Sequence, residues 1–147
     1  MSVSLPDVNM LVALHDAAHD HYEAAHRWFG HRSSQGWATC PLTVNGCVRI
    51  LSNPNYRNLK ASVDEVADRL RTLCSAPNHH FWKDELSLLD GDVFRHSHIA
   101  GPRQITDVYL LALAVSHGGR LVTFDRSIPW KAVFGAGPES IESLIPC

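Results

Sequence analysis

Short apolar runs alternate along this chain with longer segments in which apolar residues recur every three or four positions. The run at 121–124, which ends at Asp125, is the clearest of the short ones. Brief apolar runs of this kind are typical of strands inside parallel sheets. Further runs predict strands at 3–5, 37–40, 79–82 and 140–145.

Five segments with helical periodicity lie between these runs, whereas 84–103 predicts mostly loop. Ser62 and Glu65 have the spacing of a capping box and predict a sharp helix start. Gly30 is expected to end the second helix, Thr43 to cap the third and Thr106 to cap the fifth. The predicted helices are 8–14, 19–30, 43–51, 62–74 and 107–117.

Strands that alternate with helices indicate an α/β protein. We therefore expect an α/β sandwich with a central, mostly parallel sheet. The length of 147 residues is close to that of one ordinary domain, so a single domain over 1–147 is expected. With 45% apolar and 19% charged residues, the composition is that of a globular protein rather than a disordered one.

Charge and cysteine usage narrow the possible function classes. The formal net charge of −2 argues against a general polyanion binder but leaves room for a local basic groove. No apolar run approaches the roughly 18–20 residues of a membrane span, and the first residues lack the basic stretch of a secretory signal. The cysteines form no C-x-x-C pair, so a reduced, cytoplasmic protein is expected; they are Cys40, Cys47, Cys74 and Cys147.

Three aspartates occupy related positions in the predicted elements. Asp7 follows the first strand, Asp125 follows the strand at 121–124, and Asp107 lies in the first turn of a helix. In a parallel sheet, strand ends and the starts of following helices meet at one edge, where ligands bind. Clustered carboxylates are the hard oxygen ligands that Mg²⁺ or Mn²⁺ requires.

Each aspartate also has a purely structural explanation. The helix dipole favours an acid in the first turn of a helix, as at Asp107. Aspartate is equally common in turns after strands, as at Asp7 and Asp125. Their joint placement on one predicted edge favours the functional interpretation.

The segments around these acids carry a family resemblance. The three acidic segments are Asp7-Val8-Asn9, Gln104-Ile105-Thr106-Asp107 and Leu121-Val122-Thr123-Phe124-Asp125. In order and spacing they resemble the acidic landmarks of PIN domains, in particular those of VapC-type toxins of bacterial toxin–antitoxin pairs. Segments 19–29 and 43–50 resemble that family as well, so the similarity covers nearly the whole chain.

The resemblance implies a PIN-like α/β/α sandwich and a metal-dependent endoribonuclease. It further implies a homodimer that a cognate antitoxin silences. By position, Asp7, Asp107 and Asp125 are the expected catalytic and Mg²⁺- or Mn²⁺-binding acids. Asn9 and Thr123 match positions that support those acids by hydrogen bonding. The remaining expectation is contact with RNA, from Arg103 and Gln104.

One position departs from the family pattern. The family usually has a glutamate directly after the threonine of the 43–46 segment, and here that position is Val44. Valine cannot ligate a metal, so three of the usual four acids are expected. Asn45 is a poor substitute, because one helical step turns its side chain by about 100°. A second hypothesis is therefore a catalytically weakened module that binds RNA or an antitoxin.

Other features support different sites less well. His15 and His19 have the spacing of two metal ligands on a helix, but a chain turn is expected between them. Surface or partner-facing histidines are favoured over a zinc site, and Trp28 and Trp82 are expected in the core or a dimer interface. A phosphotransfer domain would need a second acid beside Asp7, which is lacking. Candidate phosphate contacts are Arg49, Arg57, Lys60, Arg103 and Arg126.

Overall fold

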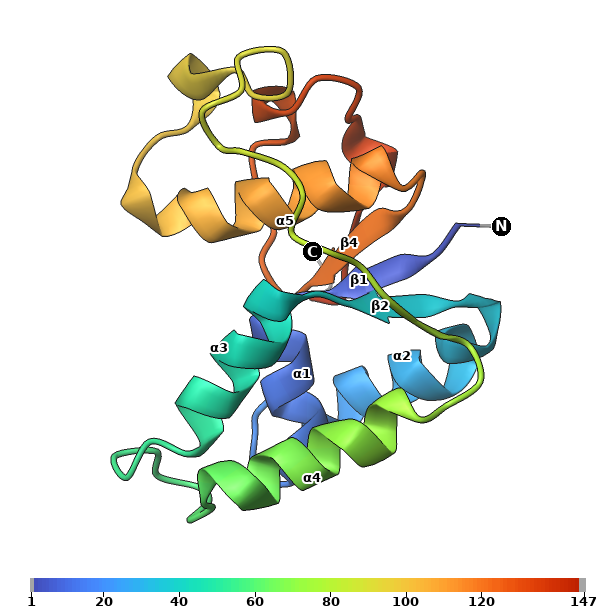
Figure 1. The fold of residues 1–147 in the computed structure, drawn as a ribbon, viewed down its shortest axis with the longest axis vertical. Coiled ribbons are helices and arrows are strands. Elements are labelled where there is room, and N and C mark those ends of the chain that lie inside the picture. Colours follow the sequence, from blue (N-terminus) through green and yellow to red (C-terminus); the bar gives the residue numbers. More distant parts are fainter. Residues whose placement is uncertain (1, 146–147) are drawn as a thin grey trace.

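The centre of the protein is a five-stranded sheet in the order β3-β2-β1-β4-β5 (Figure 1). The computed structural model describes residues 2–145, so Cys147 lies outside the described residues. All four strand pairings are parallel, as predicted. The strands are β1 Ser4–Pro6, β2 Trp37–Thr39, β3 His79–Phe81, β4 Arg120–Thr123 and β5 Ile141–Ser143.

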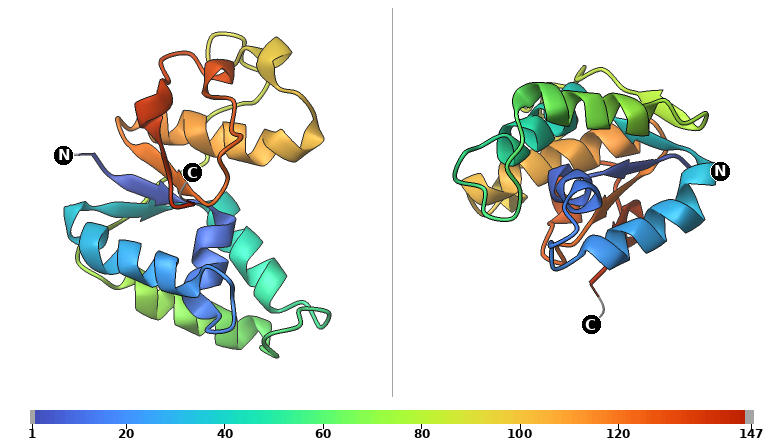
Figure 2. Two further views of the ribbon diagram at one scale, coloured as in Figure 1. Left: turned by 180° about the vertical axis from the view of Figure 1, so that it is seen from behind. Right: turned by 90° about the horizontal axis from the view of Figure 1, so that it is seen from below.

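Helices cover both faces of this sheet, which confirms the predicted sandwich. The helices α1 to α4 share a core on one face, whereas α5 and short 3₁₀ turns lie on the other (Figures 1 and 2). Within residues 2–145, no helix combines the length and the apolar character needed to cross a membrane. The helices are α1 Val8–His15, α2 Tyr22–Arg32, α3 Pro41–Leu51, α4 Val63–Cys74 and α5 Ile105–Ser116.

Side chains of the strands contribute to two separate hydrophobic cores, one on each face of the sheet. Leu5 and Leu121 point toward α5, whereas Trp37 and Val122 point toward the four-helix face. Successive strand residues face opposite sides of a sheet, so a strand covered on both faces is apolar throughout. This is why the run at 121–124 lacks the polar–apolar alternation of a half-exposed strand.

The predicted start of the third helix is wrong. The third helix begins at Pro41, and Thr43 sits in its first turn rather than capping it. The Thr43 hydroxyl oxygen instead accepts a hydrogen bond of 3.0 Å from the backbone N–H of Cys40. Proline suits the first helical position because that residue needs no N–H donor.

The second helix begins later and ends later than predicted. It starts at Tyr22 and continues through Gly30 to Arg32, so Gly30 does not stop it. The chain turns instead at Gly36, whose φ of 102° is a left-handed conformation that glycine adopts readily.

The remaining helix ends agree more closely with the sequence. Ser62 and Glu65 form the predicted capping box, with both hydrogen bonds at 3.1 Å. In α5, Thr106 lies inside the first turn rather than at the cap, because a 3₁₀ turn at Pro102–Gln104 leads into the helix. Gly118 follows the end of α5 with a φ of 69°, as a helix-ending glycine does.

Close approach of α1 and α3 fixes the start of α1 beside the sheet. Gly46 of α3 is buried against Val8, and a Cβ on Gly46 would come within 2.7 Å of the Val8 side chain. Because valine has little rotational freedom in a helix, Val8 cannot easily move aside. The absence of a side chain at Gly46 therefore sets the position of the α1 start.

We predict that Gly46→Ala destabilises the fold by about 1–3 kcal/mol through overpacking against Val8. Chemical denaturation measures this loss, and the additional substitution Val8→Ala should recover part of it. Gly30→Ala is the matched control, because nothing lies within 4 Å of its added Cβ. It should gain about 0.5–1 kcal/mol. Equal effects of the two glycine substitutions would contradict this packing argument.

Candidate active site

Asp7 links the first strand to the first helix. Its backbone N–H donates to the carbonyl of Val122 at 3.0 Å, which extends the β1–β4 pairing by one residue. Its side chain caps α1, because Oδ1 accepts a hydrogen bond of 2.9 Å from the backbone N–H of Met10. The carboxylate is buried, with 4% of the residue exposed.

Thr123 connects Asp7 to the end of the neighbouring strand β4. Its hydroxyl donates to Oδ2 of Asp7 at 2.6 Å. The same oxygen accepts a hydrogen bond of 3.0 Å from the backbone N–H of Asp125. The buried threonine therefore fixes both the Asp7 carboxylate and the turn that carries Asp125.

The other two acids complete an electronegative cluster. Asp107 is half-buried in the first turn of α5, and Asp125 is exposed, with Oδ1 accepting from the backbone and the hydroxyl of Ser127. Burial raises the pKa of Asp107, and repulsion from Asp125 raises it further. The structure thus brings three segments that are far apart in sequence to one edge of the sheet.

The same effects act more strongly on Asp7. Burial, opposed in part by the hydrogen bonds from Thr123 and Met10, raises its pKa to about 6, and repulsion from Asp107 and Asp125 adds to the increase. Ionising the Asp7 carboxylate therefore costs free energy when no cation is bound. A cation bound beside the three acids would offset that cost.

The donor set suits a hydrated divalent ion. Within residues 2–145, no three His, Cys, Asp or Glu side chains form a ready-made metal cage. Mg²⁺, however, is commonly held by one or two carboxylates while it keeps several water molecules. Each Asp7 oxygen accepts one hydrogen bond and retains a lone pair for a further interaction.

The other predicted site residues lie around this cluster. Asn9 is exposed on α1 and lines a shallow pocket together with Asp125. Gln104 uses its side-chain oxygen to accept a hydrogen bond of 2.8 Å from the backbone N–H of Ala100, and Arg103 beside it is exposed. The five candidate phosphate contacts are all exposed. They lie on α3 (Arg49), in the loop after it (Arg57 and Lys60), in the turn before α5 (Arg103) and after β4 (Arg126).

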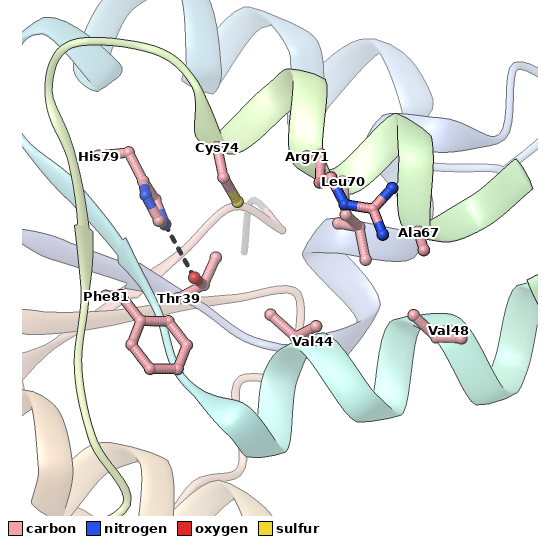
Figure 3. A pocket seen from close by; sticks show the side chains of 9 residues that line it. All are labelled: Thr39, Val44, Val48, Ala67, Leu70, Arg71, Cys74, His79 and Phe81. Carbon is pink, nitrogen blue, oxygen red and sulfur yellow. Dashed lines mark hydrogen bonds between the residues drawn. The ribbon is translucent and has the colours of Figure 1, made fainter. Parts of the chain in front are cut away.

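Val44 does not face the acidic cluster, which corrects the expectation drawn from its position in the sequence. Gly46 faces α1 next to Asp7, and two helical steps place Val44 on the opposite side of α3. Figure 3 shows Val44 projecting from α3 toward α4. It lines an apolar pocket of about 280 Å³ whose residues are Thr39, Val44, Val48, Ala67, Leu70, Arg71, Cys74, His79 and Phe81. A glutamate at position 44 would enter that pocket and would not add an acid beside Asp7.

Among the residues described, the histidines do not gather with two further His, Cys, Asp or Glu side chains into a set of metal ligands. His15 ends α1 and donates from Nδ1 to the carbonyl of Leu11 at 2.7 Å, and His19 lies in the turn that follows. The expected turn between them is therefore present. Trp28 and Trp82 are 4% and 7% exposed, so both belong to the core as predicted.

The structure adds a group of rings that sequence reasoning missed. The rings of His19 and His21 lie against Phe124, the residue between Thr123 and Asp125. These rings line the same shallow pocket as Asn9 and Asp125. The available signal was the place of Phe124 in the chain, because a large ring directly after a buried strand lies at the ligand-binding edge.

The fold and this acidic edge define a parallel α/β protein with a carboxylate cluster at the ends of its strands. Residues 4–132 match the family model of the PIN domain. Ribonuclease VapC44 of Mycobacterium tuberculosis is 43% identical over 141 residues, which cover 96% of this chain and 99% of that protein. Ribonuclease VapC39 of the same species is 40% identical over 132 residues, covering 90% of this chain and 95% of that protein. The chain therefore belongs to the PIN-domain family and, within it, to the VapC ribonucleases.

A solved structure confirms the fold. The crystal structure of Mycobacterium tuberculosis VapC20, described as a toxin that cleaves the sarcin–ricin loop, superposes with a TM-score of 0.58. The match covers 92% of this chain and 99% of the VapC20 chain at 12% sequence identity. The resemblance found in the sequence and the predicted PIN-like sandwich are thus both confirmed.

We predict that the carboxylate of Asp7 lowers the stability of the metal-free protein at neutral pH. The pKa of Asp7 is about 6 in the folded protein and 3.8 ordinarily, so the folded state holds this proton more tightly. The free energy of unfolding should therefore fall as the pH rises from about 4 to about 6. Asp7→Asn removes this dependence, so its stability relative to wild type should rise by about 2 kcal/mol between pH 4 and pH 7.5.

Urea denaturation in EDTA measures this difference. Adding Mg²⁺ at pH 7.5 should stabilise the wild type and leave Asp7→Asn unchanged, because only the wild type keeps the full carboxylate cluster. A difference between the two proteins that is independent of pH would contradict the electrostatic account of Asp7.

Proposed function

We propose that this protein is a metal-dependent endoribonuclease, the toxin of a toxin–antitoxin pair, which hydrolyses RNA phosphodiesters at Asp7, Asp107 and Asp125. The observation that carries the proposal is the convergence of these carboxylates at the edge of the sheet, where burial and then repulsion from the neighbouring acids raise the pKa of Asp7 and of Asp107. The ribonuclease relatives support an RNA-cleaving hydrolase. The acids themselves support Mg²⁺ or Mn²⁺ as the cofactor.

The chain's own groups prepare the site for this reaction. Asp7, Asp107 and Asp125 would hold a divalent ion, which would supply a water of lowered pKa and positive charge beside the scissile phosphate. Thr123 and the backbone N–H of Met10 hold the Asp7 carboxylate in one orientation, so it need not reorganise during the reaction. Asp125 is the exposed acid of the three, so we propose that RNA approaches the cluster from the side of Asp125.

Substrate and partners follow from the same assignment. RNA is the proposed substrate. We assign Arg103 a contact with an RNA phosphate, and Gln104 a contact with the same part of the RNA. Such charge contacts bind without reading sequence and weaken as salt increases. We further propose Asn9 and Thr123 as supporting residues, a cognate antitoxin that silences the site, a homodimer and a cytoplasmic location.

The alternative of a catalytically weakened binding module is not favoured. It rested on Val44 as the lost fourth acid, and Val44 lines the pocket between α3 and α4 instead. Its apolar side chain therefore leaves the charge of the acidic cluster unchanged.

We predict that the purified protein, free of antitoxin, cleaves cellular RNA with Mg²⁺ or Mn²⁺ and not with EDTA. Asp7→Asn and Asp107→Asn should each lose activity by on the order of 100-fold or more, because each removes a charge that the reaction requires. Thr123→Val should lose about 10–100-fold, because it frees the Asp7 carboxylate without removing it. Thr123→Ser should keep most of the activity.

Gel analysis of the cleaved RNA and circular dichroism of each variant measure these effects. Asp64→Asn is the matched control, because Asp64 is exposed in the first turn of α4, on a different element from the three acids. Undiminished cleavage by a folded Asp7→Asn variant would overturn the site assignment.

Val44→Glu should give no gain in cleavage per folded molecule, because the new carboxylate enters the pocket between α3 and α4. It should also lower the melting temperature, since a charge placed among apolar residues is poorly solvated. Val48→Glu, one turn further along the same face, should behave alike. A rise in cleavage rate for Val44→Glu alone would show that position 44 faces the site after all.

A further inference from the structure

Three aromatic rings form a compact surface beside the acidic cluster, here called the aromatic platform and consisting of His19, His21 and Phe124. The rings of His21 and Phe124 are stacked, with centroids 4.5 Å apart and planes at 28°. The rings of His19 and Phe124 are 6.2 Å apart at 29°, and the two histidines are 5.8 Å apart. All three residues are half-buried, and all three line the same shallow pocket.

The turn that carries the two histidines is firmly held. The backbone N–H of His21 donates to Nδ1 of His19 at 3.0 Å, which leaves Nε2 of that ring as the donor. The backbone N–H of His19 donates in turn to the carbonyl of Asp16 at 3.0 Å. The orientation of the His19 ring is thus set by the backbone.

A buried carboxylate anchors this turn to the rest of the protein. Asp16 is 2% exposed, and its carboxylate accepts from Tyr56, from Asn58 at 2.9 Å and from the backbone of Ala18 at 3.0 Å. Burial acts to raise the pKa of Asp16, but these hydrogen bonds outweigh it and hold the pKa below its ordinary value. Burying a charge is costly unless it is fully paired, so this network secures the conformation of the turn.

The platform shares its surface with the proposed active site. Phe124 lies between Thr123, which binds Asp7, and Asp125. The shallow pocket that the three rings line also includes Asn9 and Asp125. A phosphate held near the acids would therefore place the adjoining nucleoside within reach of the rings.

We propose that the aromatic platform binds a nucleobase of single-stranded RNA next to the scissile phosphate. This inference rests on the proposed function and names how the substrate is held. Unpaired bases stack on exposed aromatic side chains, and every base has a flat face that such rings can receive. These half-buried rings line one pocket with Asp125, and the His19 ring is held in one orientation by the backbone N–H of His21.

The test is the binding of a short single-stranded RNA that carries the fluorescent base 2-aminopurine. Ca²⁺ replaces Mg²⁺, and a gel confirms that the RNA stays intact. Wild type should quench the fluorescence, because 2-aminopurine loses emission when it stacks. His21→Ala and Phe124→Leu should bind about 5- to 100-fold more weakly and quench less.

Two controls separate stacking from loss of structure. His31→Ala removes a histidine from the far part of α2, where it lines another pocket, and should bind like wild type. Tyr56→Phe keeps all three rings but removes one donor to Asp16, so it should weaken binding less than His21→Ala does. Thermal unfolding of each variant establishes that the fold is retained.

The outcomes distinguish this inference from the proposed function. If wild type cleaves RNA in Mg²⁺ while His21→Ala and Phe124→Leu bind and quench as wild type does, the platform is overturned and the nuclease assignment stands. If wild type neither cleaves nor binds RNA, both fail. Weaker binding in both platform variants with His31→Ala unchanged supports the inference.

Discussion

The hydrogen bond from Thr123 to Asp7 is the interaction on which the candidate site depends. It joins two residues 116 positions apart, because β1 and β4 are neighbours in the sheet. A buried carboxylate without partners would be strongly disfavoured, and Thr123 supplies one of its two donors. The threonine also receives the backbone N–H of Asp125, so one hydroxyl sets the position of two of the three acids.

The parallel order of the strands makes this arrangement possible at little structural cost. Every strand ends at the same edge, and both faces are covered by helices, which leaves that edge free for polar groups. The edge also gathers like charges, so the acidic cluster lowers the stability of the metal-free protein. Burial and repulsion together raise the pKa of Asp7 to about 6. The cation that we propose at this edge would offset the repulsion among the acids and so remove this loss of stability.

Much of this could be predicted from the sequence, because strand ends and helix starts have strong local signals. The capping box at Ser62 is an example, because both of its hydrogen bonds join Ser62 to Glu65, only three residues further along the chain. The edge rule for parallel sheets placed the acids in one region without knowledge of the contacts. The role of Thr123 at the centre of the site followed only from a family resemblance.

The orientation of Val44 and the aromatic platform were not predicted, because both depend on contacts between helices and strands that are far apart in the sequence. Val44 faces α4 because Gly46 is committed to Val8, and no local pattern reveals which side of α3 meets α1. The aromatic platform was missed for the same reason, since Phe124 and the histidines are about a hundred positions apart. The wrong helix ends have local causes instead, because Pro41 begins α3 and the chain after α2 turns at Gly36.

The central claim is that Asp7, Asp107 and Asp125 create one cation site at the edge of the sheet. Anomalous diffraction from a crystal grown with Mn²⁺ tests it most directly. The account predicts a manganese peak coordinated by at least two of these carboxylates and by water. A peak at the histidines, with none beside the three aspartates, would contradict it.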